Sequence, residues 1–171
     1  MRRTLSRLLF AASVSALAAG AAHAQKAPFT YKEMVALDRI TGMKADPGGR
    51  YVVIDARATD VADNKGVTSL WLKDLSAPDA PEVKLAAGDG GASDAQWSPY
   101  GRTIYFLSSR GGASQIWITD ITGAAATQVT NLPLDVSAYR VTPDGEGIVL
   151  SLAVFPECKG DEIVCPVQKQ A

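Results

Sequence analysis

The chain has 171 residues, of which 47% are hydrophobic and 20% charged, with 17 basic and 18 acidic side chains. This composition is that of a folded protein and excludes an intrinsically disordered chain. A net charge of −1 argues against nucleic acid or an anionic membrane surface as the partner, because both require a basic protein face.

Residues 1–24 have the features of a secretory signal peptide. Arg2, Arg3 and Arg7 form a basic start, an apolar stretch follows, and Ala22-His23-Ala24 is an A-x-A cleavage site. Cleavage after Ala24 removes the three arginines and leaves a mildly acidic protein with a net charge of about −4. We therefore expect a periplasmic or secreted protein, exported by the general route or, given Arg2-Arg3, by the twin-arginine route.

No membrane anchor is expected. The apolar stretch of the leader is shorter and richer in alanine than a membrane span. No cysteine follows the cleavage site, as a lipid anchor would need.

A short polar turn followed by an apolar run occurs three times. The copies begin at Asp46-Pro47-Gly48-Gly49, Ser98-Pro99-Tyr100-Gly101 and Thr142-Pro143-Asp144-Gly145, and successive prolines lie 52 and 44 residues apart. A second element, 69–75, recurs as 115–121, with its tryptophans 46 residues apart. Two elements that recur in the same order with a period of about 40 to 50 residues indicate propeller blades.

The sequence predicts an all-β fold, a partial β-propeller with two four-stranded blades and part of a third. After a lead-in segment at 25–36, the blades occupy 37–155, and a cysteine-bearing loop occupies 156–171. The expected strands are about 39–45, 50–56, 69–74 and 82–85 in the first blade, 95–98, 103–108, 115–120 and 127–130 in the second, and 137–141 and 147–154 in the third. No long helix is expected after the leader.

Two other expectations concern the shape of the propeller. Residues 60–66 enlarge the second hairpin of the first blade, and we expect them to form a surface loop. Because known propellers close four to eight blades into a ring, we expect the chain to be a fragment with a truncated C-terminus. The alternative is that several chains self-associate to close one ring.

Cys158 and Cys165 are the only cysteines. In an oxidising compartment their close spacing favours a local disulfide. A metal site is not favoured, because no further cysteine and no histidine after the leader is available to complete it. Asp60, Asp63 and Asn64 share one loop but lack calcium-loop spacing.

The middle repeat identifies a resemblance. Trp97-Ser98-Pro99-x-Gly101-Arg102, then Gln115-Ile116-Trp117 with Asp120, then Thr127-Gln128-Val129-Thr130, resembles the TolB-type propeller repeat. Tyr100 stands where that repeat usually has aspartate, and Val141-Thr142 replaces tryptophan-serine in the third copy. The resemblance covers about residues 37–155.

Two families use this repeat in exported bacterial proteins: the TolB class of periplasmic propellers and the prolyl-oligopeptidase family of serine peptidases. The segment 150–158 with Cys165, and the lead-in at 29–40, look like exported acylaminoacyl-peptidase and dipeptidyl-peptidase members. The resemblance implies a substrate-gating propeller that admits peptides and is followed by a hydrolase domain or by further blades. The alternative is a TolB-like propeller that binds envelope proteins.

The chain carries no catalytic residues of its own. Its only histidine, His23, lies in the leader, so a serine-histidine-acid triad cannot be assembled, and no G-x-S-x-G elbow is present. No cofactor is expected, because the glycine-rich segment 88–93 lacks the third glycine of a dinucleotide loop and the lysine of a phosphate loop. Trp71, Trp97 and Trp117 are interpreted as blade core rather than as a sugar platform.

Overall fold

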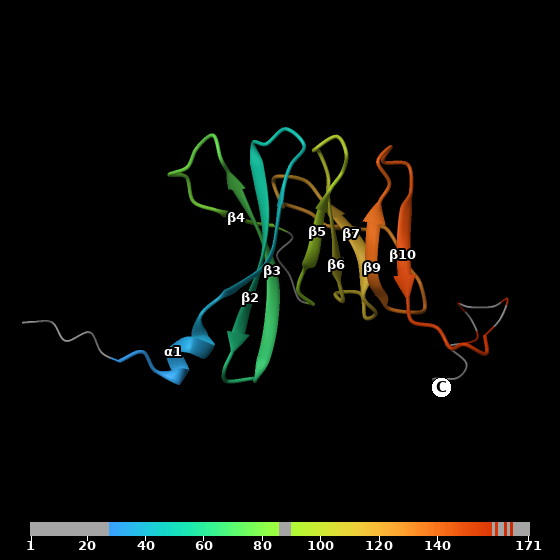
Figure 1. Cartoon of the computed structure of the whole chain (residues 1–171), viewed down its shortest axis with the longest axis horizontal. Helices are drawn as coiled ribbons and strands as arrows, with labels where there is room; N and C mark the ends of the chain where they lie inside the picture. Colours follow the sequence, from blue (N-terminus) through green and yellow to red (C-terminus); the bar gives the residue numbers. More distant parts are fainter. Residues whose placement is uncertain (1–27, 86–89, 159, 161–162, 164, 166–171) are drawn as a thin grey trace, which may run out of the picture.

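The computed structural model describes residues 28–85, 90–158, 160, 163 and 165. The expected signal peptide, with its cleavage site after Ala24, lies outside these residues. Three antiparallel sheets stand side by side in chain order, preceded by one short helix (Figure 1). Among the described residues, no helix is long and apolar enough to cross a bilayer.

Helix α1 (Tyr31–Ala36) lies within the expected lead-in segment and has six residues. It begins with a capping box, in which Thr30 and Glu33 satisfy each other's backbone N–H groups. The side chain of Glu33 accepts from the backbone and hydroxyl of Thr30, and these bonds lower its pKa. The helix ends at Leu37, which has extended backbone angles and starts the approach to the first strand.

Two of the sheets have four strands and the third has two. The first sheet has the order β1 (Arg39–Ala45), β2 (Tyr51–Asp60), β3 (Lys65–Asp74) and β4 (Val83–Leu85). The second has β5 (Ser93–Trp97), β6 (Ile104–Ser108), β7 (Gln115–Thr119) and β8 (Thr127–Gln128), and the third pairs β9 (Val136–Val141) with β10 (Ile148–Leu152). All ten expected strands are present, with ends displaced by at most four residues.

The second hairpin of the first sheet differs from the expectation of a loop at 60–66. Strands β2 and β3 remain paired as far as Asp60 and Lys65, so only residues 61–64 form the turn. The side chain of Asp60 accepts hydrogen bonds from the backbone N–H groups of Ala62 and Asp63. Asn64 takes a positive φ of 50°. Residues 60, 65 and 66 therefore belong to the two strands rather than to the loop. The side chain of Asp60 caps the short turn that remains between the strands.

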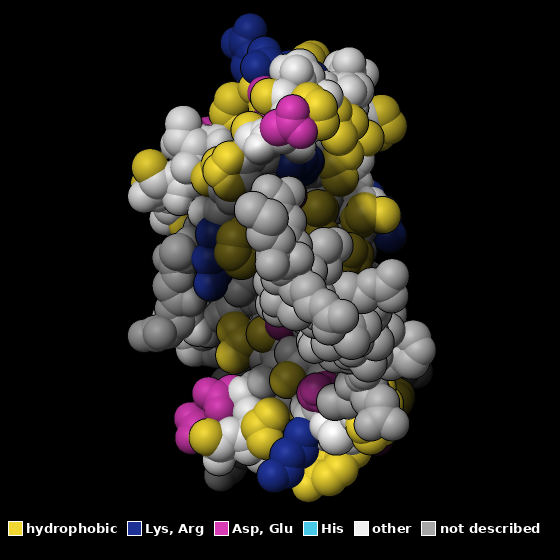
Figure 2. Space-filling model, turned by 90° about the vertical axis from the view of Figure 1, so that its left-hand side faces the viewer, with side chains coloured by type: hydrophobic (Ala, Val, Ile, Leu, Met, Phe, Trp, Pro, Cys, Tyr) yellow, Lys and Arg dark blue, Asp and Glu magenta, His cyan; other side chains and the backbone are white. Residues whose placement is uncertain are grey.

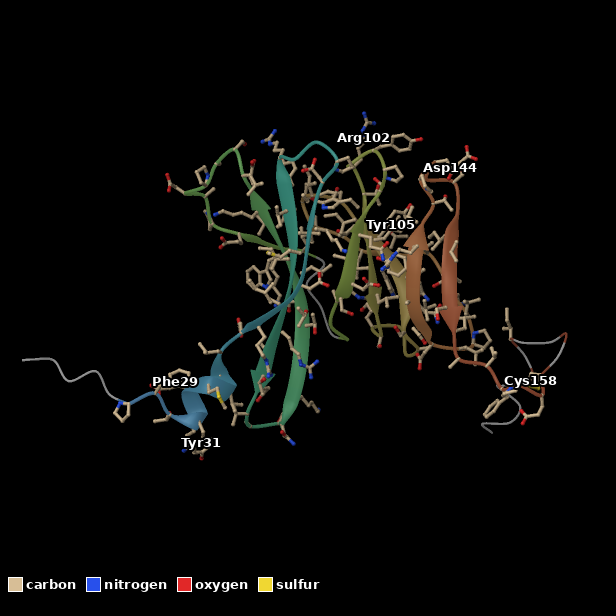
Figure 3. The ribbon with its side chains drawn as sticks, viewed as in Figure 1. Phe29, Tyr31, Arg102, Tyr105, Asp144 and Cys158 are labelled. Carbon is tan, nitrogen blue, oxygen red and sulfur yellow. A yellow bond between two sulfur atoms is a disulfide. The ribbon has the colours of Figure 1, made fainter. Side chains whose placement is uncertain are left out.

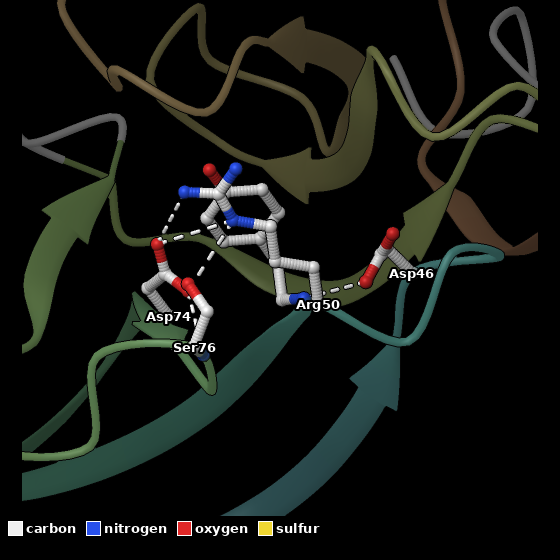
Figure 4. Close-up of polar contacts among 5 residues, drawn as sticks. Asp46, Arg50, Asp74 and Ser76 are labelled. Atoms are coloured by element: carbon white, nitrogen blue, oxygen red, sulfur yellow. Dashed lines mark hydrogen bonds and ion pairs between the residues drawn. The ribbon is translucent and has the colours of Figure 1, made fainter.

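Polar side chains stabilise the end of this sheet that lies opposite the β2–β3 turn (Figure 4). The carboxylate of Asp46 accepts a hydrogen bond from the backbone N–H of Tyr51. The guanidinium of Arg50 lies 2.8 Å from Asp74, which also accepts from Ser76. The bonds from Arg50 and then from Ser76 hold the pKa of Asp74 well below its usual value. These contacts connect the first three strands near the first repeated turn.

The core lies between neighbouring sheets, as expected for stacked blades. Between the first and second sheets it consists of Val53, Leu70, Leu72, Leu85, Ala92, Ala95, Ile104 and Phe106. Between the second and third sheets it consists of Leu107, Ile116, Val136 and Tyr139. Trp97 and Trp117 pack against the first of these clusters, which confirms the interpretation of these two residues as core.

The expected disulfide between Cys158 and Cys165 is present, with a Cα–Cα distance of 5.6 Å. Cys158 is 3% exposed, and its backbone N–H donates to the carbonyl oxygen of Phe155. The bond therefore connects two positions after the last strand that are seven residues apart in the sequence.

Candidate functional site

Two hollows are lined by residues of all three sheets. The larger, of about 570 Å³, is lined by the start of β3 and by the segments that lead into β5 and β9. The second, of about 440 Å³, is lined by β1, Asp55 and the start of β5. Ser93, Leu107 and Ser137 line both hollows. The two hollows therefore form one surface, which we call the inner groove.

Asp55 is the buried acid of the inner groove. Its side chain leaves β2, and its Oδ2 accepts a 3.4 Å hydrogen bond from the backbone N–H of Ala95 in β5. Burial raises the pKa of the Asp55 carboxyl, and hydrogen bonds from the backbones of Ala95 and Asp94 oppose that rise. Gly42 leaves room for the carboxylate, because a Cβ there would lie 3.2 Å from Asp55 Oδ2. A titratable group thus connects the first two sheets.

Tyr139 connects the second sheet to the third. Its hydroxyl donates a 2.8 Å hydrogen bond to the carbonyl oxygen of Asp94, and its own carbonyl oxygen accepts from Gln96 Nε2 at 2.9 Å. Asp94 has a positive φ of 50° and lies at an irregularity of β5 between Ser93 and Gln96. Burial raises the pKa of the Tyr139 hydroxyl well above its ordinary value, so the hydroxyl remains a donor at physiological pH.

Basic side chains lie at one end of the inner groove. Lys65 and Gly66 line the larger hollow, and the guanidinium of Arg57 lies over Gly66, where an added Cβ would come within 2.1 Å of Arg57 Nη2. Asp55 and Asp94 line the second hollow. Lys44 lines the second hollow as well, so that hollow carries charges of both signs, whereas the described charged residue that lines the larger hollow is Lys65.

Arg110 follows the second blade's serine pair and does not lie in the groove. Its Nε donates to Ser108 Oγ at 2.9 Å, and its guanidinium lies 5.2 Å from the ring centres of both Phe106 and Trp117. Burial lowers the pKa of Arg110. This arginine therefore stabilises the second sheet by hydrogen bonding and by cation–π contact.

The described part of the groove has the composition of a binding surface. Its serine hydroxyls that make hydrogen bonds donate to backbone carbonyl oxygens, as Ser108 does to Gly91 and Ser114 to Val136. Within the described ranges, no group of three or more histidine, cysteine, aspartate or glutamate side chains is placed to hold a metal. Hydroxyls, carboxylates and cations of this kind bind polar ligands by hydrogen bonds and charge.

Sequence reasoning assigned no residue to this groove. Asp55 carries the one signal that was available, because it is an acid within the otherwise apolar run of β2. Arg57 and Gly66 gave no signal. Their contact depends on the pairing of β2 with β3 beyond the strand ends that the sequence predicted, at residues 56 and 69.

The chain is similar in sequence to known peptidases. It is 28% identical over 130 residues to the uncharacterised peptidase YuxL of Bacillus subtilis, covering 72% of this chain and 20% of that protein. It is 25% identical over 158 residues to dipeptidyl-peptidase 5 of Porphyromonas endodontalis, covering 87% of this chain and 23% of that protein. The chain thus spans about a fifth of the length of these curated relatives. No family model matches it.

Solved propeller structures share the fold. The acylaminoacyl peptidase of Pyrococcus horikoshii superposes with a TM-score of 0.57 at 18% identity, over 70% of this chain and 18% of that one. TolB of Acinetobacter baumannii gives 0.51 at 22% identity, over 65% and 26% of the two chains. The β-propeller domain of the Trilobed protease of Pyrococcus furiosus gives 0.50 at 15% identity, over 66% and 33%.

The sheets, their stacking and these similarities define a propeller segment. The segment is related to the peptidases of the prolyl-oligopeptidase family and to TolB-like propellers. This relationship agrees with the resemblance found in the repeated turn and strand motifs.

Proposed function

We propose that the chain is the substrate-gating, non-catalytic propeller segment of an exported serine peptidase of the prolyl-oligopeptidase family. The carrying observation is the similarity to peptidases across 72% and 87% of the chain. The only histidine in the sequence is His23. Under this proposal the catalytic serine and histidine lie outside residues 1–171.

The inner groove supports the gating role. It is an open surface lined by residues of all three sheets, with hydroxyls, a buried acid and basic side chains within reach of a passing chain. Extended peptides expose backbone N–H and C=O groups along their whole length, so a groove of this kind can bind them without reading each side chain. Peptides are therefore the proposed ligands.

Labelling with a fluorophosphonate tests the proposal, because the reagent modifies activated serines. The full product of the gene that encodes this chain should be labelled on a serine outside residues 1–171 and should hydrolyse short peptides. The 171-residue chain alone should be neither labelled nor active toward peptide or ester substrates. Inhibitor-sensitive turnover by the purified chain alone would refute the non-catalytic role.

The second candidate is a TolB-like propeller that binds envelope proteins. The fold similarity to TolB of Acinetobacter baumannii favours it. In that case the full gene product should resist the fluorophosphonate and should instead be crosslinked to envelope proteins in living cells. These two outcomes separate the candidates.

We further propose that the protein is exported and that cleavage after Ala24 gives a mature protein starting at Gln25. The basic start, the apolar stretch and the A-x-A site support this proposal. Expression with the leader in a bacterial host, followed by cell fractionation and N-terminal sequencing, tests it. Recovery of the protein in the cytoplasm with residues 1–24 retained would contradict it.

A further inference from the structure

Within the described residues, Lys65, Gly66 and Val67 at the start of β3 have no strand partner on the edge away from β2. Strand β4 pairs with β3 only at Leu70, Trp71 and Leu72. Residues Lys65, Gly66 and Val67 are exposed, although β2 pairs with all three from the other side. An exposed strand edge offers unpaired backbone groups to another extended chain.

The direction of these backbone groups follows from a neighbouring hydrogen bond. The carbonyl oxygen of Thr68 points away from β2, because it accepts a 2.8 Å bond from the backbone N–H of Ala92. Along an antiparallel strand, alternate residues direct their N–H and C=O groups to the same edge. Gly66, two residues before Thr68, therefore presents both its N–H and its C=O to the larger hollow.

Arg57 brings a positive charge to the same place. It pairs with Thr68 across the two strands, so it shares their groove-facing side with Gly66, and its guanidinium covers that glycine. The ion pairs between described residues are Arg50 with Asp74 and Lys73 with Glu82. Within the described ranges, therefore, neither Arg57 nor Lys65 forms an ion pair.

The facing wall of the hollow supplies further donors. Ser93 and Ser137 line it, and their hydroxyls make no hydrogen bonds to described residues. The nearest acid along the hairpin, Asp60, accepts through Oδ1 from the backbone N–H groups of Ala62 and Asp63. Asp60 pairs with Lys65 across the strands and so faces the other side of the sheet from Arg57 and Gly66. This end of the groove thus combines a strand edge, the Arg57 cation and two serine hydroxyls.

We propose that this end of the inner groove binds an extended peptide segment that carries an acidic side chain. The peptide backbone pairs with Gly66 at the edge of β3, and its carboxylate lies against Arg57, which shares that side of the sheet. Charge-assisted hydrogen bonds of this type are stronger than neutral ones. The inference rests on the proposed function in one respect: the peptide is taken to be a substrate of the parent enzyme.

Fluorescence anisotropy with the full chain and a defined probe tests both parts of the proposal. The probe is fluorescein-labelled Thr-Val-Glu-Val-Thr-amide, compared with the same peptide containing glutamine in place of glutamate. We expect the glutamate peptide to bind about tenfold more tightly at low salt, which is the effect of one charge-assisted bond. A third peptide, N-methylated at the two valines, should lose about tenfold in affinity through the loss of backbone donors and the added bulk.

Charge variants locate the site. Arg57→Gln should reduce the preference for glutamate at least about threefold. Lys65→Gln should reduce it less, because the side chain of Lys65 alternates with Gly66 and faces the other side of the sheet. Arg102→Gln is the matched control, because Arg102 lies at the opposite end of the molecule, beside the repeated turns (Figure 3). Arg57→Lys keeps the charge and should keep most of the preference. High salt should bring the two affinities together even in the unmodified chain.

Equal affinity for the glutamate and glutamine peptides would overturn the charge assignment. Unchanged binding of the N-methylated peptide would overturn the strand-edge assignment. The proposed function is tested separately by serine labelling of the full gene product. If the full gene product is labelled but the chain binds none of these peptides, the groove proposal is rejected and the proposed function stands. If the chain binds the peptides but the full gene product is not labelled, the proposed function is rejected and the groove proposal stands.

Discussion

The indole nitrogen of Trp97 donates a 2.9 Å hydrogen bond to the backbone carbonyl oxygen of Lys44. Trp97 ends the first strand of the second sheet, and Lys44 lies in the first strand of the first sheet. The bond thus connects two blades across 53 residues of sequence. Trp97 also packs against the core between the same two sheets, so one side chain provides both contacts.

Trp97→Phe should therefore destabilise the stacking of the first two sheets. The phenyl ring retains much of the apolar contact but cannot donate, so a loss of about 1 kcal/mol is expected. Chemical denaturation monitored by circular dichroism measures it. Trp71→Phe is the control, because Trp71 lies under the ammonium of Lys84 rather than between sheets. An equal loss in both variants would contradict the role of the inter-sheet bond.

Substitution of alanine for glycine should cost different amounts of stability at two positions with positive φ. Gly49 (φ 71°) and Gly123 (φ 64°) have similar backbones, but a Cβ at Gly49 meets nothing within 4 Å. A Cβ at Gly123 would lie 2.8 Å from both Cα and Cδ2 of Leu85. Gly49→Ala should cost about 1 kcal/mol for the backbone alone, and Gly123→Ala about 1–3 kcal/mol more for overpacking. Equilibrium unfolding of the two variants gives the comparison, and equal losses would refute the role of Leu85.

Asp55→Asn should change the pH dependence of stability. Burial raises the pKa of Asp55 above its unfolded value of 3.8, so the folded protein binds more protons between the two values. Stability contributed by this group is therefore present at low pH and falls as pH rises through the folded pKa. Asparagine does not titrate, so the variant should gain stability relative to the original protein as pH rises from 3 to 7.

Asp120→Asn is a control of opposite sign. Hydrogen bonds from the side chain and backbone of Thr122 lower the pKa of Asp120, so its contribution is present above the unfolded pKa and is lost as pH falls. The Asp120 variant should be less stable than the original protein at pH 7 and equal to it at low pH. Urea denaturation at several pH values measures both trends. The same trend in both variants would refute the assignment for Asp55.

The disulfide between Cys158 and Cys165 should form when the protein is exported. Intact mass should show no alkylation of the exported protein before reduction and two alkylated thiols afterwards. Removal of the bond by Cys158→Ser should cost at most about 2–3 kcal/mol, because the closed loop is short. Two thiols that react without reductant would contradict the oxidised state.

The outer face of the first sheet should cause self-association. Cross-strand pairing places Met43, Ile54, Trp71 and Lys84 in one row on this face, and hydrophobic side chains are visible on this side of the molecule (Figure 2). Exposed apolar patches and sheet faces of this kind favour association. Light scattering should detect oligomers of the full chain.

Met43→Lys should reduce this association, because Met43 is 60% exposed within the row. Val61→Lys is the matched control, since Val61 is 62% exposed but lies in the turn between β2 and β3. A monodisperse monomer with a sharp, cooperative transition at high temperature would refute the association.

The repeat pattern alone determined the blade plan. Proline and glycine at fixed positions mark the turns because few other residues adopt their backbone angles, and the alternating apolar runs between them predict strands. For this reason all ten strands and their order were predictable. The disulfide was predictable from the close spacing of the only two cysteines. The boundaries of β2 and β3 were not, because Thr59, Asp60 and Lys65 have no apolar alternation, and their pairing is decided by the capped turn between them.

Only the tertiary structure decided the composition of the inner groove. Asp55 meets Ala95 across 40 residues and Tyr139 meets Asp94 across 45, so neither contact follows from a local pattern. The guanidinium of Arg57 covers Gly66, which has no side chain to block it, and among the described residues β4 pairs with β3 only at Leu70, Trp71 and Leu72. These relationships depend on how completed sheets stack, and sheet stacking is set by the fit of side chains from distant blades rather than by the sequence of any one blade.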